Sequence, residues 1–232
     1  MEYTGEQLIL GAPAAAGRTQ KEHVARYRFA QKYTKNKKVL DIACGTGYGS
    51  NMLKEAGATE VHGMDVSEEA ISFANKNYAG PSTSFSICNA ELLNSSDTYD
   101  LIVSFETIEH VDDYLRTLKN FYRALKDNGQ LIISTPNRLV TSPQAKLITD
   151  KPGNPFHVRE FTYPEIENAI KDAGFKVSNQ GQFGQCKPKK FNNKYIQGIY
   201  KLLMKGNNKY SPEVKLINDL PSIKYIVIIA DK

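Results

Sequence analysis

Acidic and histidine side chains gather within one short segment of the chain, residues 105–110. Glu106, Glu109 and His110 stand at positions i, i+3 and i+4, so one helical turn would project all three from a single face. Two carboxylates and an imidazole that meet in this way can bind a divalent cation such as Mg²⁺ or Mn²⁺. His157, within the later sequence N-P-F-H-V-R-E-F, is a candidate fourth ligand.

The same residues suit proton transfer when no metal is bound. Glu106, His110 and His157 are then the candidate catalytic residues, with either histidine as the general base. The alternative is a purely structural role, in which the acids cap a helix and the histidine lies on its solvated surface.

A glycine-rich stretch occupies residues 39–50 and reads V-L-D-I-A-C-G-T-G-Y-G-S. It joins a short apolar run, typical of a buried strand, to glycines at alternate positions and to the start of a helical pattern. Glycine lets the backbone approach a ligand closely, and the following helix directs its N–H groups to the same place. Dinucleotide-binding proteins use a related loop, but Asp41 would repel a pyrophosphate and attract an ammonium group. The stretch therefore favours S-adenosylmethionine over a nicotinamide dinucleotide.

Strand and helix patterns alternate along the chain. This alternation predicts an α/β fold with a doubly wound, mostly parallel seven-stranded sheet and an antiparallel last strand. Ligands of such sheets bind beyond the carboxyl ends of the strands, where Asp41, Asp65, Asn89 and Glu106 all stand. Strands are predicted over residues 38–42, 60–64, 84–88, 99–104, 130–134, 175–181 and 225–230, and helices over 20–33, 48–56, 67–77, 112–126 and 162–173.

The motif D-I-A-C-G-T-G-Y-G, followed by Met64-Asp65, resembles the class I S-adenosylmethionine-dependent methyltransferases over nearly the whole chain. The resemblance implies the Rossmann-like methyltransferase fold, with the loop at 45–47 against the methionine part of the cofactor. Asp41 would order this loop and face the cofactor's amino group, and Asp65 would accept hydrogen bonds from both ribose hydroxyls. Asn89 would meet the adenine amino group, where the family often has an acid. The implied cofactor-binding residues are Asp41, Ala43, Gly45, Thr46, Gly47, Asp65, Val66, Asn89, Ala90 and Phe105.

The pattern E-x-x-E-H with a later histidine resembles two groups of methyltransferases. These are the metal-dependent small-RNA 2′-O-methyltransferases and the O-methyltransferases of ubiquinone biosynthesis. The resemblance implies that Glu106, Glu109, His110 and His157 hold one divalent ion, which would lower the pKa of a substrate hydroxyl. An unactivated hydroxyl needs such help, whereas a neutral amine is already nucleophilic. O-methylation is therefore the expected reaction.

Two N-terminal segments, Y-T-G-E at residues 3–6 and E-H-V-A-R-Y-R-F-A at residues 22–30, carry a further resemblance. With N-P-F-H-V-R-E-F-T, they resemble methyltransferases associated with surface-glycan pathways. A hydroxyl of a sugar or glycan intermediate is therefore the expected acceptor. RNA 2′-O-methylation and a non-catalytic S-adenosylmethionine-binding protein are the alternatives. His23 and Arg26 are expected on a solvated helix face.

The length of 232 residues suits a single domain over 1–232. It is expected to carry an N-terminal cap helix region at 1–35 and substrate-side insertions at 136–160 and 185–222. The sequence shows neither a bilayer-spanning apolar run nor a signal peptide. Its three cysteines have no metal-type spacing, so a cytoplasmic protein is expected.

Lysines accumulate over residues 187–209, where no acid interrupts them, and residues 193–205 have an amphipathic helical pattern. The favoured interpretation is the solvated face of a lid, or of a helix in a homodimer. The alternatives are a phosphate-bearing or lipid-linked substrate, a membrane surface and, less favoured, a nucleic acid.

Overall fold

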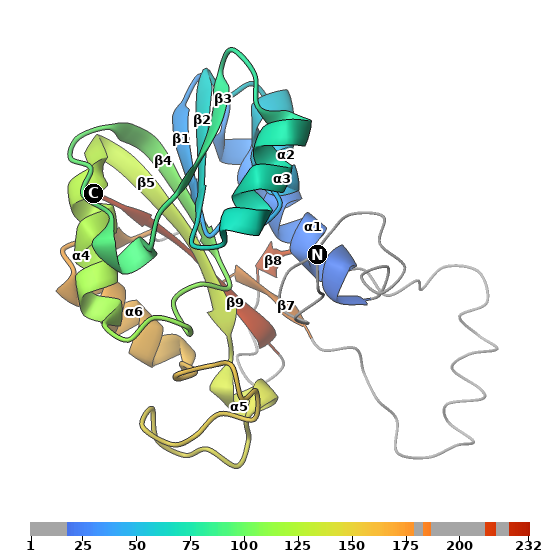
Figure 1. Ribbon diagram of the computed structural model, residues 1–232. Helices are drawn as coiled ribbons and strands as arrows, with labels where there is room; N and C mark the ends of the chain where they lie inside the picture. The colour runs from blue at the N-terminus through green and yellow to red at the C-terminus, as the bar shows by residue number, and fades with distance from the viewer. Residues whose placement is uncertain (1–17, 179–182, 187–211, 217–222) are drawn as a thin grey trace.

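The computed structural model describes residues 18–178, 183–186, 212–216 and 223–232, which form one mixed sheet with helices on both faces (Figure 1). Five parallel strands in the order β3-β2-β1-β4-β5 are continued by the antiparallel strands β9, β7 and β8, and β6 pairs with β9 beside this path. The predicted α/β class, the mostly parallel sheet and the antiparallel last strand are confirmed. The strands are β1 (Lys38–Ile42), β2 (Glu60–Asp65), β3 (Thr83–Ile87), β4 (Tyr99–Phe105), β5 (Leu125–Pro136), β6 (Lys176–Val177), β7 (Phe183–Cys186), β8 (Lys215–Leu216) and β9 (Ile223–Asp231).

The strand count differs from the prediction, because the described residues form nine strands and not seven. Strand β9 is nine residues long, so it pairs with β6 near its end and with β7 near its beginning. Of the predicted strand at 175–181, the described residues 175–178 contain the short β6, and the remainder lies outside the described residues. Strand β8 lies within the predicted insertion at 185–222 and pairs with β7. Strands of two to four residues are too short to show an alternating pattern in the sequence.

The helices divide between the two faces of the sheet. Helices α1, α2 and α3 cover one face, and α4 and α6 cover the other (Figure 1). Side-chain caps fix several helix starts, as where Ser67 Oγ accepts from Ala70 N at 3.2 Å, and where Asp113 Oδ1 accepts from Arg116 N at 2.9 Å. The helices are α1 (Arg18–Ala30), η2 (Gln31–Tyr33), α2 (Tyr48–Glu55), α3 (Glu68–Tyr78), η3 (Ala90–Leu92), α4 (Tyr114–Ala124), α5 (Arg138–Thr141) and α6 (Tyr163–Asp172).

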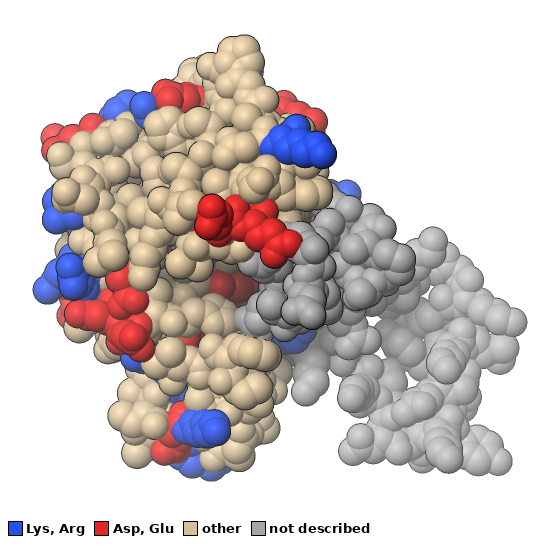
Figure 2. All heavy atoms as spheres, viewed as in Figure 1, with Lys and Arg blue, Asp and Glu red and all other residues tan. Residues whose placement is uncertain are grey.

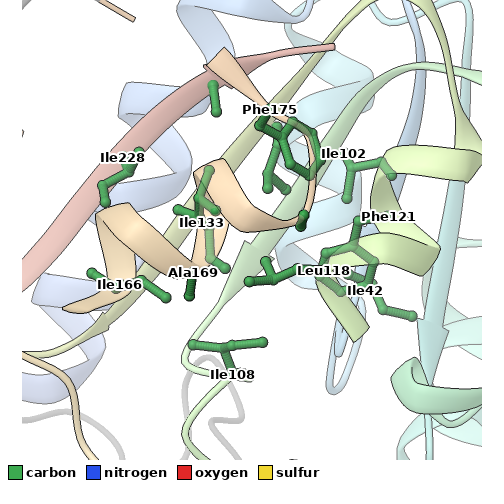
Figure 3. Packing of buried hydrophobic residues seen from close by; sticks show 14 of the residues in the cluster. Ile42, Ile102, Ile108, Leu118, Phe121, Ile133, Ile166, Ala169, Phe175 and Ile228 are labelled. Atoms are coloured by element: carbon green, nitrogen blue, oxygen red, sulfur yellow. The ribbon is translucent and has the colours of Figure 1, made fainter. Parts of the chain in front are cut away.

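Buried apolar clusters hold the helices to both faces of the sheet. On one face, Leu118 of α4 and Ile166 of α6 pack with Ile102 of β4 (Figure 3). On the other, Leu53 of α2 packs in a cluster with Val103 of the same strand. Successive residues of a strand point to opposite faces, so a central strand covered on both sides is apolar throughout. This packing fixes the strands rigidly, and their carboxyl ends therefore hold the loops in defined positions.

Part of the sequence-based prediction lies outside the described residues. This holds for the Y-T-G-E segment, the lysine-rich residues 187–209 and the amphipathic pattern at 193–205. The lid, dimer and membrane interpretations of that segment stay predictions. Within the parts of the chain that the structure describes, no helix combines the length and apolar character needed to cross a bilayer.

Candidate functional site

The carboxyl ends of β1, β2, β3 and β4 open onto a cavity of about 680 Å³. Helix α1 lines one side of it, and the segment 136–160 after β5 lines another. Figure 2 shows the hollow below the sheet, with red carboxylate side chains visible inside it. All four predicted metal ligands line the cavity, as do eight of the ten predicted cofactor-binding residues, whereas Asp41 and Gly47 do not. The eight are Ala43, Gly45, Thr46, Asp65, Val66, Asn89, Ala90 and Phe105.

The glycines of the loop after β1 meet different requirements. At Gly45, with φ of +54°, an added Cβ would meet no atom within 4 Å, so the backbone borders open space. At Gly47, with φ of +81°, a Cβ would come within 2.8 Å of the Phe85 ring, so this glycine serves the packing of the loop. The open space over Gly45 and the nearby amino end of α2 fit a cofactor that lies against backbone N–H groups.

Asp65, at the end of β2, holds this loop through both of its carboxylate oxygens. Oδ2 accepts from Gly45 N at 2.8 Å, and Oδ1 accepts from Ser67 N at 2.9 Å. Each carboxylate oxygen has a further acceptor position. The predicted hydrogen bonds to two ribose hydroxyls are therefore compatible with these contacts, and they stay a prediction.

Asp41 lies beneath the glycine loop, outside the cavity lining, and is 1% exposed. Its carboxylate accepts from Tyr27 Oη at 3.0 Å and from Ser50 Oγ at 2.6 Å. Burial raises its pKa from 3.8 to about 7, although these hydrogen bonds oppose the shift. The contacts tie β1 to α1 and α2, which is consistent with an ordering role for Asp41. The predicted contact with the cofactor's ammonium group stays a prediction.

The adenine side of the predicted site is formed by short loops after β2 and β3. Asn89 Oδ1 accepts from Glu91 N at 2.9 Å and thereby caps η3. The second lone pair of Oδ1 can accept a hydrogen bond from a ligand, and the amide N–H groups can donate to one. Val66 is 70% exposed at the cavity edge. A planar apolar ligand group would cover such a side chain.

The acidic and histidine residues do not all converge as predicted. Ligand atoms of Glu109, His110 and His157 lie within 4.8 Å of one another. Glu106 is outside this group, because its Oε1 accepts from Ser134 Oγ at 2.8 Å. The segment 106–113 forms turns and no helix. The i, i+3, i+4 spacing consequently does not place Glu106 on a shared face with the other residues.

Glu109 is a buried carboxylate with one satisfied oxygen. Its Oε2 accepts from Thr135 Oγ1 at 3.0 Å, whereas Oε1 has no hydrogen-bond partner among the described residues. Burial and the nearby carboxylate of Glu106 raise the pKa of Glu109 well above its ordinary value. A buried oxygen without a partner is costly, so the site favours either a proton or a cation there.

Hydrogen bonds orient the two histidines. Glu160 Oε1 lies 2.7 Å from His157 Nδ1 and can only accept, so Nδ1 carries the proton and Nε2 accepts from Asn154 Nδ2 at 2.8 Å. His110 Nδ1 likewise donates to the carbonyl oxygen of Phe156 at 3.1 Å, which makes Nε2 its basic nitrogen. The rings meet edge to face with their centroids 4.9 Å apart. A carboxylate beside two oriented imidazoles is a donor set that fits a divalent cation.

Arg26 of α1 is buried, and the predicted solvated position is wrong. Its guanidinium stacks over the Tyr225 ring at 4.5 Å, and Nη1 donates to Gln185 Oε1 at 2.7 Å. His23 is partly buried as well, and its Nδ1 is hydrogen-bonded to the hydroxyl of Tyr48. Helix α1 lies between α2 and the antiparallel strands, so it has no wide solvated face. The signal in the sequence was the spacing of His23, Arg26 and Tyr27, which places all three on one side of a helix.

Comparison with known proteins identifies the family. Residues 20–180 match the family model described as a methyltransferase domain. The chain is 32% identical over 180 residues to a probable S-adenosylmethionine-dependent methyltransferase of Mycolicibacterium smegmatis, with 77% of this chain and 67% of the relative aligned. It is also similar to a ubiquinone biosynthesis O-methyltransferase of Pelagibacter ubique, at 33% identity over 50% of this chain and 49% of the relative. Phosphoethanolamine N-methyltransferase 3 of Arabidopsis thaliana is 32% identical over 60% of this chain and 29% of its own length.

The chain thus spans about two thirds or less of the length of these curated relatives. A crystal structure of an S-adenosylmethionine-dependent methyltransferase from Mesorhizobium loti has the same fold. It superposes with a TM-score of 0.62 at 17% identity and covers 91% of this chain and 100% of that one. From the family match and the shared fold, the chain belongs to the methyltransferase domain family and is a class I S-adenosylmethionine-dependent methyltransferase.

Proposed function

We propose that this methyltransferase transfers the methyl group to a hydroxyl, most simply that of a sugar or glycan intermediate. The observation that carries the proposal is the cluster of Glu109, His110 and His157, which lines the same cavity as the glycine loop. An alcohol has a very high pKa and reacts only when its proton is removed or its oxygen is polarised. A neutral amine acceptor would not require such a cluster.

The three residues also suit a divalent cation, which would supply Lewis acidity to the acceptor hydroxyl when bound. Glu109 Oε1 would be one ligand, since it is buried and has no other partner among the described residues. His110 would bind through Nε2. Binding through Nε2 of His157 would require Asn154 to give up its hydrogen bond. Glu106 lies outside this group of three, and its Oε1 accepts from Ser134 Oγ.

The same residues can act as a base when the acceptor itself is bound. The proton on Nδ1 of each histidine is held by an acceptor, so Nε2 is the atom that would receive the proton of the hydroxyl. At His157 this would require Asn154 to give up its hydrogen bond to Nε2. Glu160 stabilises the positive charge that His157 would then carry. The cofactor supplies the methyl group as a sulfonium, whose positive charge is favoured by the carboxylates around the cavity.

The comparisons leave both oxygen and nitrogen open as the acceptor atom, since one relative is an O-methyltransferase and another an N-methyltransferase. Two observations support a neutral, hydroxyl-bearing acceptor. The cluster provides the activation that oxygen requires, and five carboxylate residues line the cavity, an environment that disfavours a phosphate group inside it. RNA is therefore the weaker alternative. A phosphate or lipid carrier would lie outside the cavity.

The test uses S-adenosylmethionine labelled on its methyl group, the purified protein and an extract of the source cells. Products are separated into glycan or lipid-linked, RNA and small-molecule fractions, with and without a chelator. We expect label in the glycan fraction that decreases with chelator and with Glu109→Gln, but not with Glu167→Gln, a change in α6 outside the cavity lining. Label in RNA or in an amine would contradict the acceptor. If labelling is unaffected by the chelator, the cation has no role in the reaction, and the histidines act as the base.

A further inference from the structure

The cavity has an unequal distribution of charge. Among the described residues that line the cavity, five are acidic, whereas Arg26 is the single basic residue of the lysine or arginine type. The cofactor brings a positive sulfonium and a positive ammonium group, which suit an acidic cavity, but it also brings a carboxylate on its methionine part. That carboxylate would be repelled by the lining unless it meets a cation. The acidic residues are Asp65, Glu91, Glu106, Glu109 and Glu160.

Arg26 has the geometry of a prepared anion-binding group. It is 1% exposed, its guanidinium is fixed against Tyr225, and Nη1 is satisfied by Gln185. Nε has no hydrogen-bond partner among the described residues. Nη2 forms an ion pair with Glu106 Oε1 at 4.0 Å, a separation that is too long for a hydrogen bond. A buried guanidinium is costly unless its donors are used. The remaining donors therefore fit a planar carboxylate, which accepts two parallel N–H groups.

The position of Arg26 connects it with the methionine end of the cofactor site. Tyr27, the next residue of α1, donates to Asp41 beneath the glycine loop. His23, one turn earlier, contacts Tyr48, which follows the loop directly. Thr19, His23 and Arg26 all line the cavity, so this face of α1 borders the same space as the loop.

Within that face of α1, Arg26 is the residue that carries a positive charge. Burial, and next the charge of Arg26, lower the pKa of His23 well below its ordinary value. His23 is therefore neutral and does not compete for an anion.

We propose that Arg26 binds the α-carboxylate of the methionine part of S-adenosylmethionine. A carboxylate of the acceptor has the same chemistry, but every turnover brings the cofactor's carboxylate into this cavity whatever the acceptor is. The inference rests on the cofactor of the family and does not depend on the hydroxyl acceptor proposed above.

The test compares two ligands that differ in the group Arg26 would bind. S-adenosylhomocysteine has the amino-acid carboxylate, whereas 5′-deoxy-5′-methylthioadenosine lacks the amino-acid part entirely. Calorimetry gives the Kd of each ligand for the wild-type protein and for Arg26→Met. Loss of hydrogen bonds to a charged group predicts that S-adenosylhomocysteine binds about 10- to 100-fold more weakly. Binding of methylthioadenosine should stay within about twofold, since its adenosine contacts are elsewhere.

Two further variants complete the design. Arg26→Lys keeps the charge without the planar fork, so its affinity for S-adenosylhomocysteine should fall between those of the wild type and Arg26→Met. Arg28→Met, on the exposed side of α1, should bind both ligands as the wild type does. Equal weakening of both ligands would show a structural role for Arg26 and overturn the proposal. Unchanged binding of S-adenosylhomocysteine would overturn it too.

Discussion

Replacement of Asp41 by asparagine removes a buried carboxylate while retaining its shape. In the wild type, Tyr27 and Ser50 donate to this carboxylate, yet burial raises its pKa from 3.8 to about 7. An asparagine keeps one acceptor oxygen, has an NH₂ group in place of the second carboxylate oxygen, and stays neutral at every pH, so its loss of a hydrogen bond does not vary with pH. The variant therefore isolates the cost of ionising Asp41 in the folded protein.

The sign of the effect follows from proton linkage. In the unfolded chain Asp41 loses its proton near pH 3.8, whereas in the folded protein it keeps the proton up to about pH 7. Between these values the unfolded state binds fewer protons, so the contribution of Asp41 to the free energy of unfolding decreases as the pH rises. About three pH units at about 1.36 kcal/mol each give a loss of about 4 kcal/mol, which is complete above pH of about 7.

Urea unfolding of the wild type and of Asp41→Asn at several pH values measures this loss. The difference between the two free energies of unfolding cancels the titration of all other groups. As the pH is raised from about 4 to about 7.5, the free energy of unfolding of Asp41→Asn should increase by about 3–4 kcal/mol relative to that of the wild type. Asp100→Asn is the matched control with the opposite sign, because hydrogen bonds from Lys38 N and Lys126 lower the pKa of Asp100 despite the opposing effect of its burial. Parallel stability curves for the wild type and Asp41→Asn would refute the raised pKa.

Three other substitutions test the site and its support. Asp65→Ala should weaken cofactor binding by about 1–3 kcal/mol in calorimetry, because hydrogen bonds to a carboxylate are lost; an unchanged affinity would remove Asp65 from the site. In Gly49→Ala the new Cβ would lie 1.9 Å from the Tyr27 ring. Overpacking and displacement of the ring outweigh a gain of about 1 kcal/mol in helix propensity, so we expect a net loss of about 1–3 kcal/mol by urea unfolding. Gly80→Ala, which would meet no atom within 4 Å, should leave stability nearly unchanged, and an equal loss in both variants would contradict the packing argument. Glu160→Gln should weaken Mn²⁺ binding about 10-fold or more, and an unaffected Kd would argue against the cation site.

Much of the fold was predictable because its signals are local. The apolar run at 38–42 matches β1 at both ends, and Ser67 caps α3 as its residue type and the following acids suggest. In contrast, β7 and β8 depend on pairing with strands distant in the sequence, since β9 supplies the hydrogen-bonding edge for β7 and β7 supplies that for β8. Helix α5, a single turn capped by Asn137, lies within the predicted insertion at 136–160, where no helix was predicted. Elements this short carry too few residues for a periodic pattern.

The sequence predicted which types of residue form the candidate site, but not how their side chains are oriented. Asp65 and His157 line the cavity as expected. Asp65 ends the parallel strand β2, and His157 lies in the connection after β5, so both are at the carboxyl edge of the sheet, where ligands bind. Arg26 was missed, because arginine is normally exposed and its burial here results from the packing of α1 against β9 and β7. The partners that satisfy it, Gln185 and Tyr225, are about 160 to 200 residues away in the sequence, so no local pattern could indicate them.

Backbone conformation explains why Glu106 departs from its neighbours. Ala43 and Glu106 follow β1 and β4 directly, and both adopt left-handed conformations, with φ of +61° and +55°. Such a conformation costs a residue other than glycine about 1–2 kcal/mol, so each must be held by its surroundings. At Glu106 the sharp turn places the carboxylate against Ser134 and Arg26, outside the group formed by Glu109 and the two histidines. The spacing of acids and histidine assumes a regular helix and cannot reveal this turn. The ends of β1 and β4 therefore combine strained backbone with residues that line the cavity, a combination that stable packing of the two strands alone does not require.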